Sequence, residues 1–283
     1  MPDQPSDATP TVDVWAIQPP AAATADATGG DAVVEEPSPR RSRRAPHEAR
    51  TDWRLGGRTV LRWREALLAV ALVSLGAGVL LGSLVTTVWD SPWAAASATV
   101  LIWIGMLGPI VWAFTRSRPI GLLRLRAIDL LYGLVLGALL RTTQGWIEGV
   151  GGTPVLPVLE RVDGSLPLST MLFDVVAPIV VAPVVEEFFF RAVLLVALYT
   201  VLRRPFGKFA AGLAAALAST ALFVLMHGIS SVGDVSGVVS LSLLGMVCAL
   251  LVLLTGRIWG AVLVHAVYNA SYVGLGLLVG AMT

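Results

Sequence analysis

The stretch "VVEEFFFRAVLL", residues 184–195, places two glutamates and an arginine inside an otherwise apolar run. A charged side chain at the centre of a bilayer costs about 2.5–3.5 kcal/mol on insertion scales, so such residues normally pair with each other or mark a functional site. Glu187 and Arg191 are four residues apart, which in a helix places them on one face, where they can neutralise each other. Glu186 lies about 100° from Glu187 around the helix and therefore needs a different partner.

The composition is that of an integral membrane protein. Of the 283 residues, 55% are hydrophobic and only 14% are charged, whereas soluble domains contain about 25% charged residues. The single cysteine, Cys248, excludes an intramolecular disulfide. A basic stretch precedes the first apolar run, and beside a membrane we interpret it as a solvated, orienting flank rather than a nucleic-acid-binding patch.

The apolar runs predict an all-α, polytopic helical membrane protein with seven to eight transmembrane helices. The fourth run contains Pro178 and Pro183, so we expect it to be kinked or divided into two pieces. Arg124, Arg126 and Asp129 interrupt the third run, which has the alternative of beginning as an interfacial amphipathic piece. Each run is near the roughly 20 residues that cross a bilayer; they are 66–88, 94–115, 123–140, 171–201, 209–228, 236–255 and 258–281.

Composition and charge divide the chain into three parts. Residues 1–62 are predicted to be a disordered, basic tail, because the first 39 are rich in Pro, Ala, Thr and Asp and offer no apolar periodicity. Residues 63–165 contain the first helices, and residues 166–283 contain the polar motifs. Basic residues lie before the first span and in alternate loops, whereas the other loops are acidic, so the positive-inside rule predicts a cytoplasmic N-terminus and an external C-terminus.

Two histidines are the available partners for Glu186, because the third, His47, lies in the polar tail. His227 ends "FVLMH", with Phe223 one turn earlier, and His265 begins "HAVYN", with Asn269 four residues later on the same helix face. A lone histidine in a helix is more often a satisfied core residue than a catalyst. Two histidines, a carboxylate and an asparagine from three separate apolar runs instead predict one polar site within the membrane.

Helix geometry sets a condition on that site. Counted from the basic loops at 1.5 Å per residue, Glu186 and His227 lie about 22 and 28 Å deep, but His265 lies only about 12 Å deep. A single site needs Glu186 and His265 within about 10 Å of each other, which requires tilted helices or a projection of residues 203–210 beyond the bilayer.

These motifs differ from three known signatures of intramembrane proteases. The sequence contains no "HExxH" zinc motif, no Gly-x-Ser-x-Gly elbow and no "GxGD" aspartyl motif. The ordered motifs "EEFFFR", "FVLMH" and "HAVYN" closely resemble those of the CPBP family, which includes the CAAX prenyl proteases and bacteriocin-processing enzymes. The resemblance covers roughly residues 170–283, and one departure is Ala192, where many members have glycine.

This resemblance implies that residues 166–283 form the catalytic core of an intramembrane endopeptidase. It implies that Glu186 and His227 activate the attacking water, and that His265 and Asn269 stabilise the developing oxyanion. It also implies supporting positions, which are Glu187, Arg191 and Phe223. The expected partners are the lipid bilayer and a membrane protein or peptide substrate, with no nucleic acid, and the expected location is a bacterial plasma membrane.

Two alternatives remain at this point. Glu186, His227 and His265 form a two-histidine, one-carboxylate set that can hold Zn²⁺ with an open position for water. We prefer a metal-free mechanism, because the sequence reveals no carboxylate partners behind the histidines. The rival to an enzyme is a non-catalytic membrane scaffold or immunity protein that keeps the family fold. No residue in these motifs indicates recognition of a prenyl group.

Overall fold

A computed structural model of the chain describes residues 52–55, 60, 62–151, 159, 165–228 and 235–282. Of the tail predicted to be disordered, residues 1–62, most lies outside these described residues, but residues 53–55 form a short helix with Trp53 buried, so the prediction is wrong there. All described residues belong to one compact unit, residues 43–283. Helices form the described elements and no strand occurs among them, which confirms the all-α prediction.

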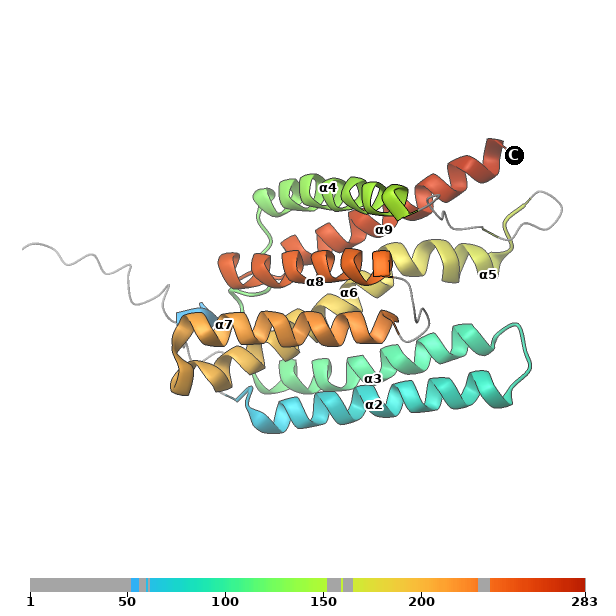
Figure 1. Ribbon diagram of the computed structural model, residues 1–283. Coiled ribbons are helices and arrows are strands. Elements are labelled where there is room, and N and C mark those ends of the chain that lie inside the picture. Colours follow the sequence, from blue (N-terminus) through green and yellow to red (C-terminus); the bar gives the residue numbers. More distant parts are fainter. Residues whose placement is uncertain are drawn as a thin grey trace, which may run out of the picture. The chain divides into compact units, whose positions relative to one another are not determined.

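The described helices follow the predicted apolar runs (Figure 1). Five helical stretches are long and apolar enough to cross a membrane, as expected of an integral membrane protein. One of them, residues 168–227, combines the predicted fourth and fifth spans, because α7 turns back at Gly207, whose φ is 76°. The predicted third span corresponds to α4, which is not among the five. The longer helices are α2 (Glu65–Val88), α3 (Ala94–Arg116), α4 (Ala127–Gly151), α7 (Val196–Gly228), α8 (Val235–Thr255) and α9 (Trp259–Met282).

The helical run before α7 changes its hydrogen-bond register instead of breaking. It consists of α5 (Leu168–Thr170), the π-helix η3 (Met171–Val181), α6 (Ala182–Glu187) and the π-helix η4 (Phe188–Leu195). Right-handed helical backbone angles continue across each junction, so of the two expected outcomes, a kink or two pieces, the division into two pieces does not occur. The π register is rare in helices and is frequent at functional sites.

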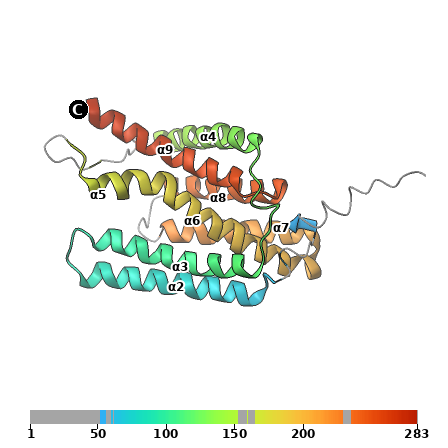
Figure 2. The same ribbon diagram turned by 180° about the vertical axis from the view of Figure 1, so that it is seen from behind.

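This run occupies the centre of the helix array. Figure 2 shows it passing between α3 on one side and α9 on the other, and contacts with both helices agree. α2 packs along α3, and α4 packs along α9. Residues 189–197 are all buried, so the charged motif lies inside the protein rather than facing lipid.

Glycines allow the paired helices to approach closely, as small residues do in membrane helix interfaces. In α4, a Cβ at Gly133 would lie 2.5 Å from Cβ of Leu263, and one at Gly137 would lie 2.8 Å from Cβ of Val267. In α2, a Cβ at Gly78 would lie 3.0 Å from the carbonyl oxygen of Leu101 in α3. These closely spaced glycines therefore serve helix packing.

Replacing Gly137 with alanine is expected to lower the free energy of unfolding by about 1–3 kcal/mol, the usual cost of overpacking. The new methyl group would also lie 2.9 Å from the backbone oxygen of Val264, which cannot move aside as a side chain can. Gly145→Ala in the same helix is the matched control, because nothing lies within 4 Å of a Cβ there. Denaturant unfolding in detergent compares the two variants, and equal stabilities would contradict the packing argument.

A buried ion pair fixes the beginning of α4 against the α8–α9 turn. The guanidinium of Arg257 binds both carboxylate oxygens of Asp129, at 2.7 and 3.1 Å. The other role of Asp129 is to accept a hydrogen bond from the backbone N–H of Arg126 at 2.8 Å, which caps the helix. The hydrogen bonds between Arg257 and Asp129 raise the pKa of the Arg257 guanidinium. Of the three charges that interrupt the predicted third span, that of Asp129 is therefore paired inside the fold, whereas Arg124 and Arg126 are exposed.

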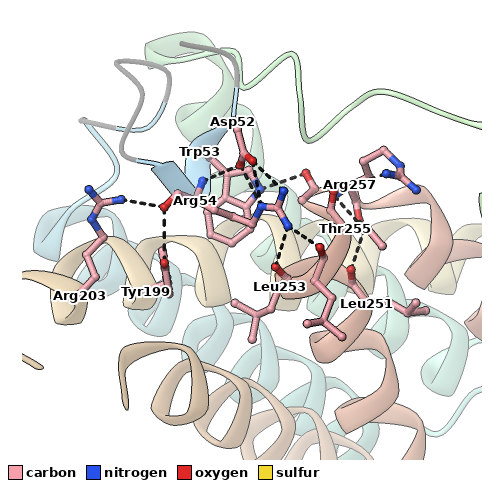
Figure 3. Close-up of polar contacts among 11 residues, drawn as sticks. Asp52, Trp53, Arg54, Tyr199, Arg203, Leu251, Leu253, Thr255 and Arg257 are labelled. Atoms are coloured by element: carbon pink, nitrogen blue, oxygen red, sulfur yellow. Dashed lines mark hydrogen bonds and ion pairs between the residues drawn. The ribbon is translucent and has the colours of Figure 1, made fainter. Parts of the chain in front are cut away.

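The short helix η1 (Trp53–Leu55) docks on the end of α8 (Figure 3). Trp53 is fully buried, and its indole N–H donates to the carbonyl of Gly256 at 3.1 Å. Arg54 donates to the carbonyls of Leu253 and Leu254, so its cation satisfies groups that a helix C-terminus leaves without donors. The chain is thereby anchored where α8 ends. We call this side, with the ends of α3 and α8 and the beginnings of α2, α4 and α9, the arginine-rich end.

Candidate active site

Three helices bring Glu186 and two histidines together. Glu186 in α6 is only 7% exposed, His227 lies in the last turn of α7, and His265 lies in the second turn of α9. Nε2 of His227 is 3.4 Å from Oε2 of Glu186, and Nε2 of His265 is 3.9 Å from the same oxygen. The condition set by the helix-depth argument is therefore met, and the three side chains occupy one site.

The counted depth of Glu186 and His227 exceeds that of His265 because of the structure at the arginine-rich end. The hydroxyl of Tyr199 and the guanidinium of Arg203 donate to the backbone oxygen of Arg54, at 3.5 and 3.2 Å (Figure 3). Since Arg54 caps α8, Tyr199 and Arg203 are level with the end of α8. Residues 204–210 are all exposed and extend beyond that level. Counting depth from these residues overestimates it, which favours the second of the two expected explanations.

Glu187 connects Arg191 to His265. The side chains of Glu187 and Arg191 are both fully buried, and Oε1 of Glu187 is 3.1 Å from Nη1 of Arg191, in an orientation that makes an ion pair rather than a directed hydrogen bond. The pairing predicted from their spacing is confirmed. The same Oε1 lies 3.0 Å from Nδ1 of His265, 78 residues later in the chain. A carboxylate does stand behind one histidine, contrary to the argument used above to prefer a metal-free mechanism.

Phe223 lies between Arg191 and the two histidines. Its ring is fully buried, 4.4 Å from the ring of His227 and edge-on to that of His265 at 5.6 Å. The guanidinium carbon of Arg191 lies 4.4 Å from the centre of the Phe223 ring, within the range of a cation–π interaction. Nη2 of Arg191 also donates to the carbonyl of Gly245 at 3.3 Å. These contacts fit the supporting positions predicted for Phe223 and Arg191.

The hydrogen bonds of His227 define how its ring can exchange protons. Its Nδ1 lies 2.8 Å from the carbonyl oxygen of Phe223, and because a carbonyl only accepts, we assign a proton to Nδ1. Nε2 is then the nitrogen that faces Glu186. A neutral His227 presents a lone pair to the carboxyl group, and a charged one presents a second N–H. The Glu186–His227 pair can therefore hold one shared proton.

Asn269 supplies a hydrogen bond that the proline-containing run lacks. The N–H of Ala182 donates five residues back, to the carbonyl of Ala177. In the same register, the carbonyl of Pro178 would require an N–H from Pro183, which has none. Nδ2 of Asn269 donates to that carbonyl instead, at 2.8 Å. One amide hydrogen of Asn269 therefore joins α9 to η3, and the second remains for another acceptor.

The variant Asn269→Ala is expected to lower the free energy of unfolding by about 1 kcal/mol, because the Pro178 carbonyl loses its donor. In a Pro183→Ala background the backbone supplies an N–H at position 183, so the same substitution is expected to cost less. A double-mutant cycle on denaturant unfolding in detergent measures this coupling. Equal costs in the two backgrounds would contradict the proposed replacement of a missing backbone donor by Asn269.

A cavity of about 710 Å³ contains all four residues predicted to be catalytic. The first turns of α3 and the helix η3 form two of its walls, and the ring of Trp93 meets that of Phe173 edge-on at 6.2 Å. The lining passes from exposed residues near the start of α3 to the buried carboxylate of Glu186. The cavity thus connects the charged site with exposed residues near the start of α3. Its polar and charged lining residues include Thr99, Ser169, Asp174, Glu186, His227, His265 and Asn269.

Part of the sequence matches the model of a known protein family. Residues 168–271 match the family model described as type II CAAX prenyl endopeptidase Rce1-like. This segment, which we call the Rce1-like segment, is similar to that family over less than half of the chain. The match confirms the resemblance to the CPBP intramembrane proteases, and the Rce1-like segment contains every residue to which that resemblance assigns a role. No curated protein and no solved structure matches the chain significantly.

The Rce1-like segment does not enclose the cavity alone. Trp93, Thr99 and Trp103 of the α3 region line it, and they precede the matched residues. α3 also contacts α6 and η4 directly. The helices before the Rce1-like segment therefore contribute to the surface that a substrate meets, although the family motifs lie entirely outside them.

The arrangement of Glu186, His227 and His265 bears on the zinc alternative. Among the described residues, no group of three or more His, Cys, Asp or Glu side chains is arranged to hold a metal ion. Nε2 of His227 and Nε2 of His265 each approach Oε2 of Glu186, at 3.4 and 3.9 Å. The arrangement thus gives the zinc set no support, although the carboxylate behind His265 removes the earlier objection to it.

Proposed function

We propose that the protein is an intramembrane endopeptidase that hydrolyses peptide bonds of membrane-associated proteins or peptides. The observation that carries this proposal is the contact of Glu186 with His227 at 3.4 Å in a cavity of about 710 Å³. The similarity of residues 168–271 to the Rce1-like family supports protease chemistry at the level of the family. The arrangement of the side chains supports the roles proposed for individual residues.

In the proposed reaction, the Glu186–His227 pair removes a proton from a water molecule, whose oxygen attacks the carbonyl carbon of the scissile bond. Glu186 suits this role because Oε2 is buried and meets no directed hydrogen-bond donor within the described residues. The proton then passes from the pair to the leaving nitrogen as the C–N bond breaks. General acid–base catalysis of this kind typically contributes a factor of about 10²–10⁴ in rate.

His265 and Asn269 are proposed to stabilise the oxyanion that forms at the attacked carbonyl. Nδ1 of His265 faces Glu187, so its Nε2 presents an N–H toward Glu186 and the cavity only when the ring is doubly protonated. The carboxylate of Glu187 supports that charged ring. Asn269 offers its second amide hydrogen. Donors of this kind are commonly worth about 3 kcal/mol each in a water-excluded site.

The first test compares new peptide termini by mass spectrometry in membranes from cells that express the wild type or Glu186→Gln at matched levels. Termini that occur only with the wild type would establish proteolysis and identify substrates together. The same termini in both samples, under several growth conditions, would favour the alternative of a non-catalytic membrane scaffold or immunity protein that keeps the fold.

Metal analysis of the purified protein tests the mechanism separately. We expect no stoichiometric zinc and no loss of activity with chelators, since the proposed steps use only side chains and water. His227→Ala and wild type are compared for bound zinc by mass spectrometry. Stoichiometric zinc in the wild type that disappears in His227→Ala would contradict the metal-free mechanism.

A further inference from the structure

The cavity is reached from one end of the helix array, opposite the arginine-rich end. Pro92 and Trp93 precede α3, and Ser169 lies one residue into α5, so these lining residues mark the beginnings of two helices at that side (Figure 1). Trp93 is 52% exposed, whereas Glu186 and His265 at the inner part of the cavity are buried. We call this side the cavity end.

Basic residues are concentrated at the other side of the molecule. In the part of the chain that the structure describes, every lysine and arginine except Arg141 and Arg191 lies at the arginine-rich end or in the exposed turn of α7 beside it. The cavity end contains Asp90, Glu148 and Asp174 around the single Arg141. The basic residues of the arginine-rich end are Arg54, Arg62, Arg64, Arg116, Arg118, Arg124, Arg126, Arg203, Arg204, Lys208 and Arg257.

The connecting sequences agree with this distribution. The sequences between α4 and α5 and between α7 and α8, residues 152–164 and 229–234, contain Arg161 as their single basic residue together with Glu160, Asp163 and Asp234. The sequence before η1 contains the basic stretch 40–50, and the docking of Trp53 and Arg54 anchors that side of the chain at the arginine-rich end (Figure 3).

Loops rich in lysine and arginine near the ends of transmembrane helices remain in the cytoplasm. We infer that the arginine-rich end is cytoplasmic and that the cavity opens on the extracytoplasmic side of the membrane. This assignment of substrates rests on the proposed function. The substrates are polypeptide segments that approach from outside, either extracytoplasmic parts of membrane proteins or exported peptides held at the outer leaflet. A protein tail that is confined to the cytoplasm cannot enter through this opening.

The recessed position of the site also limits the conformation of the substrate. His227 lies in the last turn of α7, and Figure 1 shows α7 ending short of α3 and α5 on the cavity side. The aromatic pair Trp93 and Phe173 stands in the wall between the outside and Glu186. An extended segment can pass such a wall, whereas a folded domain cannot, so cleavage is expected in unstructured segments beside the membrane.

Cysteine labelling in intact bacterial cells tests the sidedness without requiring activity. Ser91→Cys places a thiol at the cavity end, and Ser117→Cys places one at the arginine-rich end; both positions are half-buried in the wild type, so they are matched. The native Cys248 is fully buried, so the wild type is the unlabelled control. A membrane-impermeant maleimide is expected to label Ser91→Cys in intact cells and Ser117→Cys only after lysis. The reverse pattern would overturn the inference.

The cavity itself is tested with Ser169→Cys and, in case that variant fails to fold, with Thr99→Cys, since both positions line it. The impermeant reagent is expected to label either thiol from outside, and protection of both in intact cells would overturn the inference. The terminus experiment separates the two proposals. Wild-type-specific termini in cytoplasmic segments would support proteolysis but contradict external access, whereas an absence of such termini would contradict proteolysis and leave the labelling result to decide sidedness.

Discussion

Purified Glu186→Gln enzyme is expected to hydrolyse its substrate about 10²–10⁴-fold more slowly than the wild type, because an amide cannot accept the proton that the carboxylate removes from water. The substitution keeps the shape of the side chain. Glu186 is buried without a directed hydrogen-bond donor on Oε2 in the described part of the chain, so the loss of rate is not expected to come from unfolding.

His227 makes this prediction more specific. If Glu186 and His227 hold one proton between them, His227→Ala removes the same function, and the double variant is expected to be no slower than the slower single variant. Independent roles would instead give rate losses that multiply. Glu65→Gln is the matched control, since Glu65 is exposed in the first turn of α2 and its rate is expected to stay unchanged.

The measurement is the single-turnover rate in detergent or liposomes, on a peptide taken from the termini found in membranes, with unfolding followed in parallel. A Glu186→Gln enzyme that is folded and retains more than about a tenth of the wild-type rate would exclude Glu186 as the base. In that case the shared proton of the Glu186–His227 pair would have a structural purpose, and the scaffold alternative would gain support.

Local spacing made part of this site predictable from sequence. Glu187 and Arg191 face each other because residues four apart share a helix face, whatever the rest of the fold does. The apolar runs placed the helices because about 20 apolar residues are needed to cross a bilayer. The three motifs were expected to converge because polar side chains at membrane depth need partners, and Glu186 does meet both histidines.

Contacts between distant helices were not predictable in the same way. The contact of Glu187 with His265, and that of Asn269 with the carbonyl of Pro178, depend on the rotation of α9 against α6 and η3. No local pattern encodes that rotation. For the role of Asn269 the sequence did contain a partial signal. In the π register the carbonyl of Pro178 would need an N–H from Pro183, which has none. The docking of Arg54 on α8 links residues about 200 positions apart and had no sequence signal.

The replacement of Arg191 with methionine is expected to destabilise the protein by about 3–5 kcal/mol, the usual cost of removing one partner from a buried ion pair. Glu187 would then keep its charge in a fully buried position, with His265 as its remaining described contact. Methionine approximates the length of the aliphatic part of arginine, so the change tests charge more than volume. Denaturant unfolding in detergent measures the loss, and Arg204→Met, at an exposed arginine, is the control with no expected change.

The double variant Glu187→Gln/Arg191→Met separates support of the fold from support of the site. Both charges are then absent, so much of the lost stability is expected to return. Activity is not expected to return, because a neutral amide at position 187 cannot stabilise a charged His265 ring as the carboxylate does. Recovery of both stability and rate would show that Glu187 serves only to neutralise Arg191. Recovery of stability alone would show that one carboxylate both balances a buried arginine and prepares the histidine that faces Glu186.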